Sequence, residues 1–250
     1  MATTVDSTSM TLGEHLNELR SRIVKSAAAI LAATALVWAK YEFVFDFLRK
    51  PFDSAHDQHP QTILALTGVT SGLALQLNVA LIGGLICSSP IWIYQIWRFV
   101  APGLHRKEKK WAVIFTGIAV PMFLAGCWLG YAVLPGTLNT LFEFTPAEVS
   151  NVTNVDSYIS FALHLTLFFG LGFLLPVLLL ILNFFGVAPG QAMLRGWRWI
   201  VLGSFFFGAI ATPNGDPLGM SIIALPIMVL CFGAIGIALL NDRRLSSKTA

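Results

Sequence analysis

Two glutamates offer the clearest binding chemistry in the sequence, because each stands among cations at the border of an apolar run. Glu108 lies in RFVAPGLHRKEKKW, residues 98–111, as the one carboxylate beside five Lys and Arg residues. Glu18 precedes Arg22 by four residues, a spacing at which the two can pair on a helix. A carboxylate can accept two parallel hydrogen bonds from a guanidinium group, which an ammonium group cannot imitate. On these residues alone, ordinary surface charges remain an open alternative for both glutamates.

The segment around Glu18 has the pattern of an amphipathic helix. Thr11 and Glu14 have the spacing of a capping box, so a helix is expected to begin there. Apolar residues at positions 12, 16, 19 and 23 share one face of that helix. We expect Leu16 and Leu19 to pack the helix that presents Glu18. We also expect the helix to lie at a membrane interface before it continues into an apolar segment.

The composition is typical of a polytopic membrane protein. Of the 250 residues, 56% are hydrophobic and only 12% are charged, whereas soluble domains average about 25% charged residues. The mean hydropathy is +0.72, and apolar runs near the roughly 20 residues that span a bilayer recur along the chain. A net charge of +3 is too small and too dispersed to indicate nucleic acid binding. The three cysteines lie inside apolar runs, so no disulfide framework is expected.

Six transmembrane helices are predicted within a single all-α membrane domain, residues 1–250. Their expected ranges are 23–39, 72–96, 111–134, 158–185, 197–211 and 218–240. Residues 1–22 precede them as an amphipathic segment, and residues 241–250 follow as a polar tail. Residues 40–71 are expected to form a turn-rich connection, in which residues 62–66 could be a short surface helix. Pro135 is expected to end the third span, and prolines inside four spans favour kinked helices in a curved bundle.

The distribution of cations predicts the orientation in the membrane. Thirteen of the sixteen Lys and Arg residues lie on the side shared by both termini and by the second and fourth connections between spans. Only Lys40, Arg49 and Lys50 lie on the opposite side. The positive-inside rule therefore predicts that both termini are cytoplasmic.

Catalytic chemistry is scarce in the sequence. It has no nucleophile elbow, HExxH motif or phosphate-binding glycine loop, so we predict a protein that is not an enzyme and has no cofactor or metal. His56 and His59 form an HxxH, which without further ligands favours a plain loop over a metal site. Gln95 and His164 are polar groups within spans. Such groups most often join helices, although an intramembrane ionisable residue such as His164 could also be functional.

Several motifs, in order along the chain, resemble those of the TatC family, the multi-spanning core and receptor subunit of the twin-arginine protein translocase. HLNELRSR, residues 15–22, is similar to that family's HLxELRxR signature. The second signature is matched by Ser89-Pro90, by YQIW at residues 94–97, by Phe99, by APGL at residues 101–104 and by Glu108. Further agreement comes from Pro51, from Ser157-Tyr158, and from Thr212-Pro213 with Asp216. The resemblance covers residues 12–244, nearly the whole chain.

The resemblance implies specific roles for these residues. In this family, the carboxylates at the positions of Glu18 and Glu108 bind the two consecutive arginines of a Tat signal peptide. The predicted signal-peptide-binding residues are Glu18, Glu108, Arg20, Leu16, Leu19, Phe99 and Pro102. The residues predicted to have partner-contacting or structural roles are Pro51, Gln95, His164 and Asp216.

The resemblance also implies an architecture, a location and partners. The expected fold is a concave, glove-like bundle in the cytoplasmic (inner) membrane, with short fifth and sixth spans. The expected partners are TatA-like and TatB-like single-span proteins, other TatC copies and membrane lipids. The cargo would be folded proteins with twin-arginine signal peptides, exported with the proton-motive force.

One position departs from the family pattern. Many members carry a glutamate two residues before a proline in the fourth span, where this chain has Leu174 before Pro176. The role of that acid cannot be carried over. His164 lies roughly 80° around the helix from Leu174, so it is no obvious substitute. An alternative from another class is a small-solute secondary transporter, but the sequence has no charge at mid-membrane and no internal repeat.

Overall fold

The computed structural model describes residues 12–56, 62–100, 108–143, 152–212 and 217–249 as a helical bundle. Its helices are α1 (Leu12–Ala39), α2 (Tyr41–His56), α3 (Ser71–Cys87), α4 (Ser89–Val100), α5 (Glu108–Glu143), α6 (Val155–Phe184), α7 (Gly190–Arg195), α8 (Trp197–Ala211) and α9 (Pro217–Thr249). Two short strands, β1 (Ile63–Ala65) and β2 (Val152–Asn154), complete the described elements. The prediction of an all-α polytopic membrane protein is confirmed.

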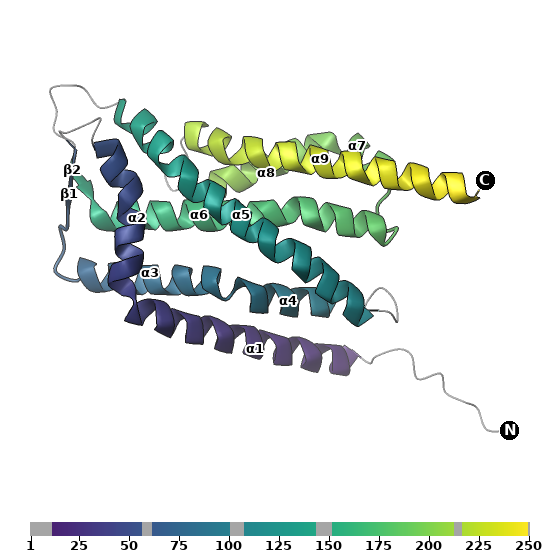
Figure 1. The fold of residues 1–250 in the computed structure, drawn as a ribbon, viewed down its shortest axis with the longest axis horizontal. Helices are drawn as coiled ribbons and strands as arrows, with labels where there is room; N and C mark the ends of the chain where they lie inside the picture. Colours follow the sequence, from purple (N-terminus) through teal and green to yellow (C-terminus); the bar gives the residue numbers. More distant parts are fainter. Residues whose placement is uncertain (1–11, 57–61, 101–107, 144–151, 213–216, 250) are drawn as a thin grey trace.

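Helix α6 is the centre of the bundle (Figure 1). It contacts α3, α5 and α9, and half of its length is buried although its sequence is apolar on every side. Asn154 caps its start, because the Asn154 side chain accepts a hydrogen bond from the Asp156 N–H. Small residues bring α5 very close: an added Cβ at Gly126 would lie 2.6 Å from the Phe169 carbonyl oxygen. The core therefore depends on backbone proximity between α5 and α6.

The second predicted span is broken. Helices α3 and α4 meet at Ser88 with a bend of 56°, where the sequence predicted one helix over residues 72–96. Pro90 has no N–H to donate and is best tolerated in the first turn of a helix, so a new helix begins at Ser89. At the break, the Leu85 carbonyl accepts a hydrogen bond of 2.9 Å from the Trp92 indole N–H.

The other predicted spans differ from the structure mainly at their ends. Helix α8 has the predicted range, 197–211, and α6 starts three residues before its predicted start. Pro135 does not end the third span, because α5 continues to Glu143 and buries Leu138 and Phe142 beyond the proline. Helix α9 likewise continues to Thr249, through the predicted polar tail. Four long apolar helices, the bent α3–α4 pair and the short α8 are the candidate membrane-crossing elements among the described residues.

Two predictions for residues 40–71 are wrong. Residues 41–56 form the helix α2 rather than turns, and residues 63–65 form a strand rather than a surface helix. The strand is held by non-local pairing: β1 pairs in parallel with β2, with Leu64 opposite Thr153. The helix buries one apolar face that includes Leu48 and Phe52 against the core.

Pro51 has a structural role in attaching α2 to the bundle. It lies buried inside the helix, and its ring nitrogen cannot donate to the Phe47 carbonyl one turn earlier. The Tyr131 hydroxyl of α5 donates a hydrogen bond of 2.8 Å to that carbonyl instead. At the next residue, the Tyr158 hydroxyl of α6 donates a hydrogen bond of 2.7 Å to the Leu48 carbonyl. Two tyrosines thus anchor the helix that the proline would otherwise weaken.

We expect Tyr158→Phe to lower the free energy of unfolding by about 1 kcal/mol, the usual net contribution of one hydrogen bond. Tyr158 is only 3% exposed, so water cannot replace its hydroxyl at the Leu48 carbonyl. Thermal unfolding of the purified protein in detergent micelles measures the change. Tyr131→Phe is the matched control, because its hydrogen bond is solvent-accessible and should matter less. Equal losses for both variants would contradict this ranking.

Candidate functional site

The two polar segments singled out in the sequence lie at the same end of the bundle. Figure 1 shows the start of α1, the end of α4 and the start of α5 at one end, together with α7 and the end of α9. Helix α4 contacts both α1 and α5, so it connects the two segments. Glu108 is the first residue of α5, but its side chain lies outside the described residues. The structure therefore describes the Glu18 side of this end in atomic detail.

Glu18 forms the predicted ion pair with Arg22. The Arg22 Nη2 donates to Glu18 Oε1 on the same face of α1, one turn apart. The side chain of Arg22 is 10% exposed and that of Glu18 is 25% exposed, so the pair is largely shielded from solvent. Glu18 Oε2 is buried and has no hydrogen-bond partner within the described part of the chain. One oxygen of this carboxylate is thus left without a described donor.

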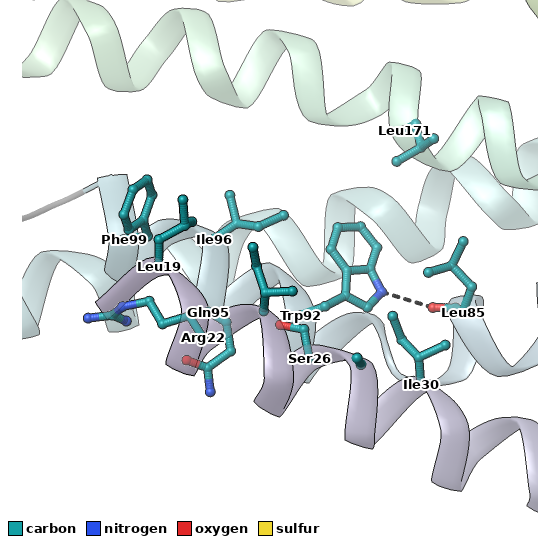
Figure 2. Close-up of a pocket in the computed structure, with 12 residues that line it drawn as sticks. Leu19, Arg22, Ser26, Ile30, Leu85, Trp92, Gln95, Ile96, Phe99 and Leu171 are labelled. Atoms are coloured by element: carbon teal, nitrogen blue, oxygen red, sulfur yellow. Dashed lines mark hydrogen bonds between the residues drawn. The ribbon is translucent and has the colours of Figure 1, made fainter. Parts of the chain in front are cut away.

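Arg22 also lines an apolar groove (Figure 2). It encloses about 450 Å³ and lies between α1 and α4, with one side chain from α3 and one from α6. Its lining residues are Leu19, Arg22, Ile23, Ser26, Ala27, Ile30, Leu85, Trp92, Gln95, Ile96, Phe99 and Leu171. Arg22 is the only charged group among these twelve, and Gln95 and Ser26 are the other polar ones. The groove is therefore suited to an apolar chain that carries a polar group at one end.

The break between α3 and α4 shapes this groove. Because the helix bends at Ser88, α4 diverges from the line of α3, and Trp92 lies across the floor of the groove with its N–H bonded to the Leu85 carbonyl. The Trp92 ring also packs against Phe123 of α5 in a T-shaped pair, with ring centroids 5.5 Å apart. Trp92, Leu85 and Leu171 were not among the predicted site residues, since the bend that brings them together was not predicted.

Besides Glu18, four of the predicted peptide-binding residues are described, and their positions differ. Leu19 and Phe99 line the groove, Leu19 from α1 and Phe99 from α4. Leu16 is 64% exposed, so the expectation that it packs the helix is wrong. It lies on the outer part of the apolar stripe, which faces the surroundings of the bundle. Arg20 is also exposed.

The residues predicted to have structural or partner-contacting roles lie in different parts of the bundle. Gln95 lines the groove, and Pro51 lies far from it in α2. His164 Nδ1 lies 2.6 Å from the Ser160 carbonyl, and the Ser160 hydroxyl accepts a hydrogen bond from Asn78 of α3. The hydrogen bond of His164 thus lies within α6, and the link between α6 and α3 is the bond between Ser160 and Asn78. Pro102 and Asp216 lie outside the described residues.

Leu174 occupies an apolar environment in α6. It is half-buried and packs against the cluster that contains Trp92 and Phe123. An acid at this position would lie beside aromatic rings, whereas leucine is compatible with them. Among the described residues, no group of three or more His, Cys, Asp or Glu side chains could hold a metal ion.

Comparisons with known proteins converge on one family. The profile of the Sec-independent protein translocase protein (TatC) family matches residues 14–226. The TatC protein of Xylanimonas cellulosilytica is 40% identical over 242 residues, which cover 96% of this chain and 88% of the relative. The chloroplastic TATC of Arabidopsis thaliana is 32% identical over 95% of this chain and 69% of its own length. A crystal structure of the twin arginine translocase receptor TatC aligns with a TM-score of 0.80 at 30% identity, over 91% of this chain and 99% of that one.

Proposed function

The chain belongs to the TatC family of Sec-independent protein translocase proteins, and from this premise we propose that it is the receptor and core subunit of a twin-arginine translocase. TatC proteins are translocase components, and the family is not one of enzymes. The family and the close structural likeness favour this function over that of a small-solute transporter.

The observation that carries the proposal is the unsatisfied carboxylate oxygen of Glu18, whose ion-pair partner Arg22 lines an apolar groove. A signal peptide of this class presents guanidinium groups followed by an apolar stretch. Glu18 offers a buried oxygen without a partner, and Leu19, Ile96 and Phe99 line the adjoining groove. Charge-assisted bonds from guanidinium to carboxylate are about twice as strong as neutral ones, and the fork geometry favours arginine over lysine.

Glu108 supplies the second carboxylate of the proposed site. It begins α5, where the helix dipole favours an anion. The start of α5 lies at the same end of the bundle as the start of α1, with α4 between them (Figure 1). Two carboxylates on either side of α4 would each bind one of two adjacent arginines. A single exposed ion pair would contribute only about 0.2–1 kcal/mol to the binding free energy. The remaining proposed contacts, Pro102 and Arg20, would flank this pair.

The proposed receptor face is cytoplasmic. Six crossings are proposed for a single membrane domain: α1, the α3–α4 pair, α5, α6, α8 and α9. The helix ends that carry Arg20, Arg98, Arg195 and Arg243 share one end of the bundle (Figure 1), which by the positive-inside rule faces the cytoplasm. Both termini would then be cytoplasmic in the inner membrane.

The proposed partners are membrane proteins and cargo. Large apolar side chains are exposed on α8, including Trp199, Leu202 and Phe206. In a bilayer such a face contacts lipid or the helix of a single-span protein. TatA-like and TatB-like proteins, further TatC copies and membrane lipids are the partners that this receptor would use. His164 and Asp216 remain proposed structural or partner-contacting positions.

The experiment that tests the function is site-specific photocrosslinking to a signal peptide. A photoreactive amino acid at position 99 leaves both glutamates intact and lies in the groove, which Arg22, the partner of Glu18, also lines. We expect a crosslink to a twin-arginine peptide in membranes that contain the partner subunits, and at least a fivefold weaker one to the twin-lysine version. Equal crosslinking of both peptides would refute the proposed receptor function. Uptake of a small solute by vesicles of the purified protein would favour a transporter.

A further inference from the structure

A second cavity lies between α7 and the C-terminal part of α9, at the end of the bundle that also holds the start of α1 (Figure 1). It encloses about 610 Å³, which is within the range of about 300–1,000 Å³ that small-molecule sites have. Each of the two helices contributes an arginine to its lining, Arg195 from α7 and Arg243 from α9. It shares no lining residue with the groove between α1 and α4, so it is a separate candidate site.

Hydrogen bonds to Asp242 fix the walls of this cavity. Asp242 Oδ2 accepts a bond of 2.7 Å from the Gly190 N–H of α7, and Asp242 Oδ1 accepts one of 2.9 Å from Asn183 Nδ2 of α6. Asn183 is only 3% exposed, and its own Oδ1 accepts from Asn241 Nδ2. An added Cβ at Gly190 would lie 2.8 Å from the Leu239 backbone nitrogen. Helix α7 is therefore held closely against α9, and the cavity between them has a defined shape.

The charges that line the cavity favour an anion. Arg195 and Arg243 are exposed cations, whereas Asp242 is the one acid among the described lining residues. Both oxygens of Asp242 already accept hydrogen bonds from protein donors. Guanidinium groups bind phosphate through two parallel hydrogen bonds, which makes arginine a frequent phosphate ligand. The cavity is thus suited to a phosphate group.

The surroundings of the cavity indicate that the phosphate belongs to a lipid. Leu194 of α7 and Leu240 of α9 are exposed, and each is adjacent in sequence to a lining residue. Trp197 is also exposed, and the guanidinium of Arg198 lies 5.9 Å from the centroid of its ring. Tryptophan is typical of the level of the lipid headgroups. A free phosphate ion would leave the two leucines uncovered, whereas the acyl chains of a lipid would cover them.

We propose that this cavity binds the phosphate of an anionic lipid headgroup. Arg195 and Arg243 donate hydrogen bonds to the phosphate oxygens, and the Gln191 side chain, which also lines the cavity, donates to the rest of the headgroup. Basic pockets of this kind between membrane helices bind anionic lipids on the cytoplasmic side. The inference rests on the membrane orientation given with the proposed function, but it does not depend on recognition of a signal peptide.

The test is native mass spectrometry of the full-length protein, titrated in detergent micelles with phosphatidylglycerol or with phosphatidylcholine of the same acyl chains. We expect the wild-type protein to bind phosphatidylglycerol about tenfold more tightly, and the Arg195→Gln, Arg243→Gln double variant to lose this preference. Arg198→Gln is the matched control, because Arg198 is an exposed arginine at the same end of the bundle that does not line the cavity. It should keep the preference within about twofold.

Several outcomes would overturn the lipid site. One is equal binding of the two lipids by the wild-type protein, and another is an equal loss in Arg198→Gln and in the double variant, which would indicate a general attraction to the positive charge of this end. Release of bound phosphatidylglycerol by an equal concentration of inorganic phosphate would assign the cavity to a soluble anion. Release by a polyglutamate peptide would assign it to an acidic polypeptide.

A parallel measurement separates this site from the proposed receptor function. The double variant should bind a twin-arginine signal peptide within about twofold of the wild-type affinity, because Arg195 and Arg243 do not line the groove between α1 and α4. If the wild-type protein bound twin-arginine and twin-lysine peptides equally but kept its preference for phosphatidylglycerol, the receptor function alone would fail. If it distinguished the peptides but not the lipids, the lipid site alone would fail.

Discussion

Export of a twin-arginine cargo is expected to fall below about a tenth of the wild-type level when Glu18 or Glu108 is replaced by alanine. Each variant removes the acceptor of a charge-assisted hydrogen bond, and bonds to charged groups contribute roughly 1.5–3 kcal/mol, a factor of 10 or more. In Glu18→Ala, Arg22 also loses its described partner and becomes an unpaired buried charge. Export of a folded reporter with a twin-arginine signal, measured against the amount of inserted protein, gives the effect.

Two further variants separate loss of binding from loss of folding. Glu18→Gln keeps the shape and one carbonyl acceptor but removes the charge, so export should fall while insertion is unchanged. Glu42→Ala is the control, since this exposed glutamate lies in the first turn of α2, at the opposite end of the bundle. Normal export by the Glu18→Ala, Glu108→Ala double variant would refute the two-carboxylate mechanism and leave the membrane fold untouched.

The sequence predicted most of the transmembrane helices because hydropathy is a local property. Each apolar run needs an internally hydrogen-bonded backbone in a bilayer, so its length and position follow from composition. The range of α8 was predicted to the residue, and that of α6 nearly so. The Glu18–Arg22 pair was predictable for the same reason, since both partners lie one turn apart on one helix.

Prolines show where local prediction fails. Pro135 was expected to end a helix but lies within α5, whereas Pro90 was expected inside a helix and marks the start of a new one. Pro51 lies inside α2 because Tyr131, 80 positions further along the chain, satisfies the carbonyl that it leaves free. Whether a proline breaks a helix thus depends on contacts with residues far away in the sequence. The residues next to the proline do not reveal those contacts.

The groove could not be predicted, because its walls come from four helices. Leu19 and Phe99 were expected to contact the peptide through the family resemblance, but their common groove depends on the bend at Ser88 and on Leu171 of α6. Leu16 shares the apolar stripe with Leu19, yet it is exposed, because the stripe is wider than the contact that α1 makes with the bundle. Periodicity identifies an apolar face but does not say which part of it is covered by protein.

Gly84→Ala is expected to destabilise the protein by about 1–3 kcal/mol, the usual range for overpacking in a tight core. An added Cβ at Gly84 would lie 2.6 Å from the Thr34 backbone nitrogen and 2.7 Å from its Cα. These are backbone atoms, so the clash cannot be relieved by a side-chain rotation, and α1 would have to move away from α3. Thermal unfolding in detergent micelles measures the loss of stability.

The same substitution is expected to weaken signal-peptide binding, because α1 carries Glu18, Arg22 and one wall of the groove. Gly72→Ala is the matched control: this glycine lies in the same helix α3, and a Cβ there has nothing within 4 Å. It should leave stability unchanged or slightly increased, since alanine is the better helix former, and peptide affinity should stay within twofold. If Gly84→Ala and Gly72→Ala behaved alike in both measurements, close contact between α1 and α3 would not be what positions the Glu18 site.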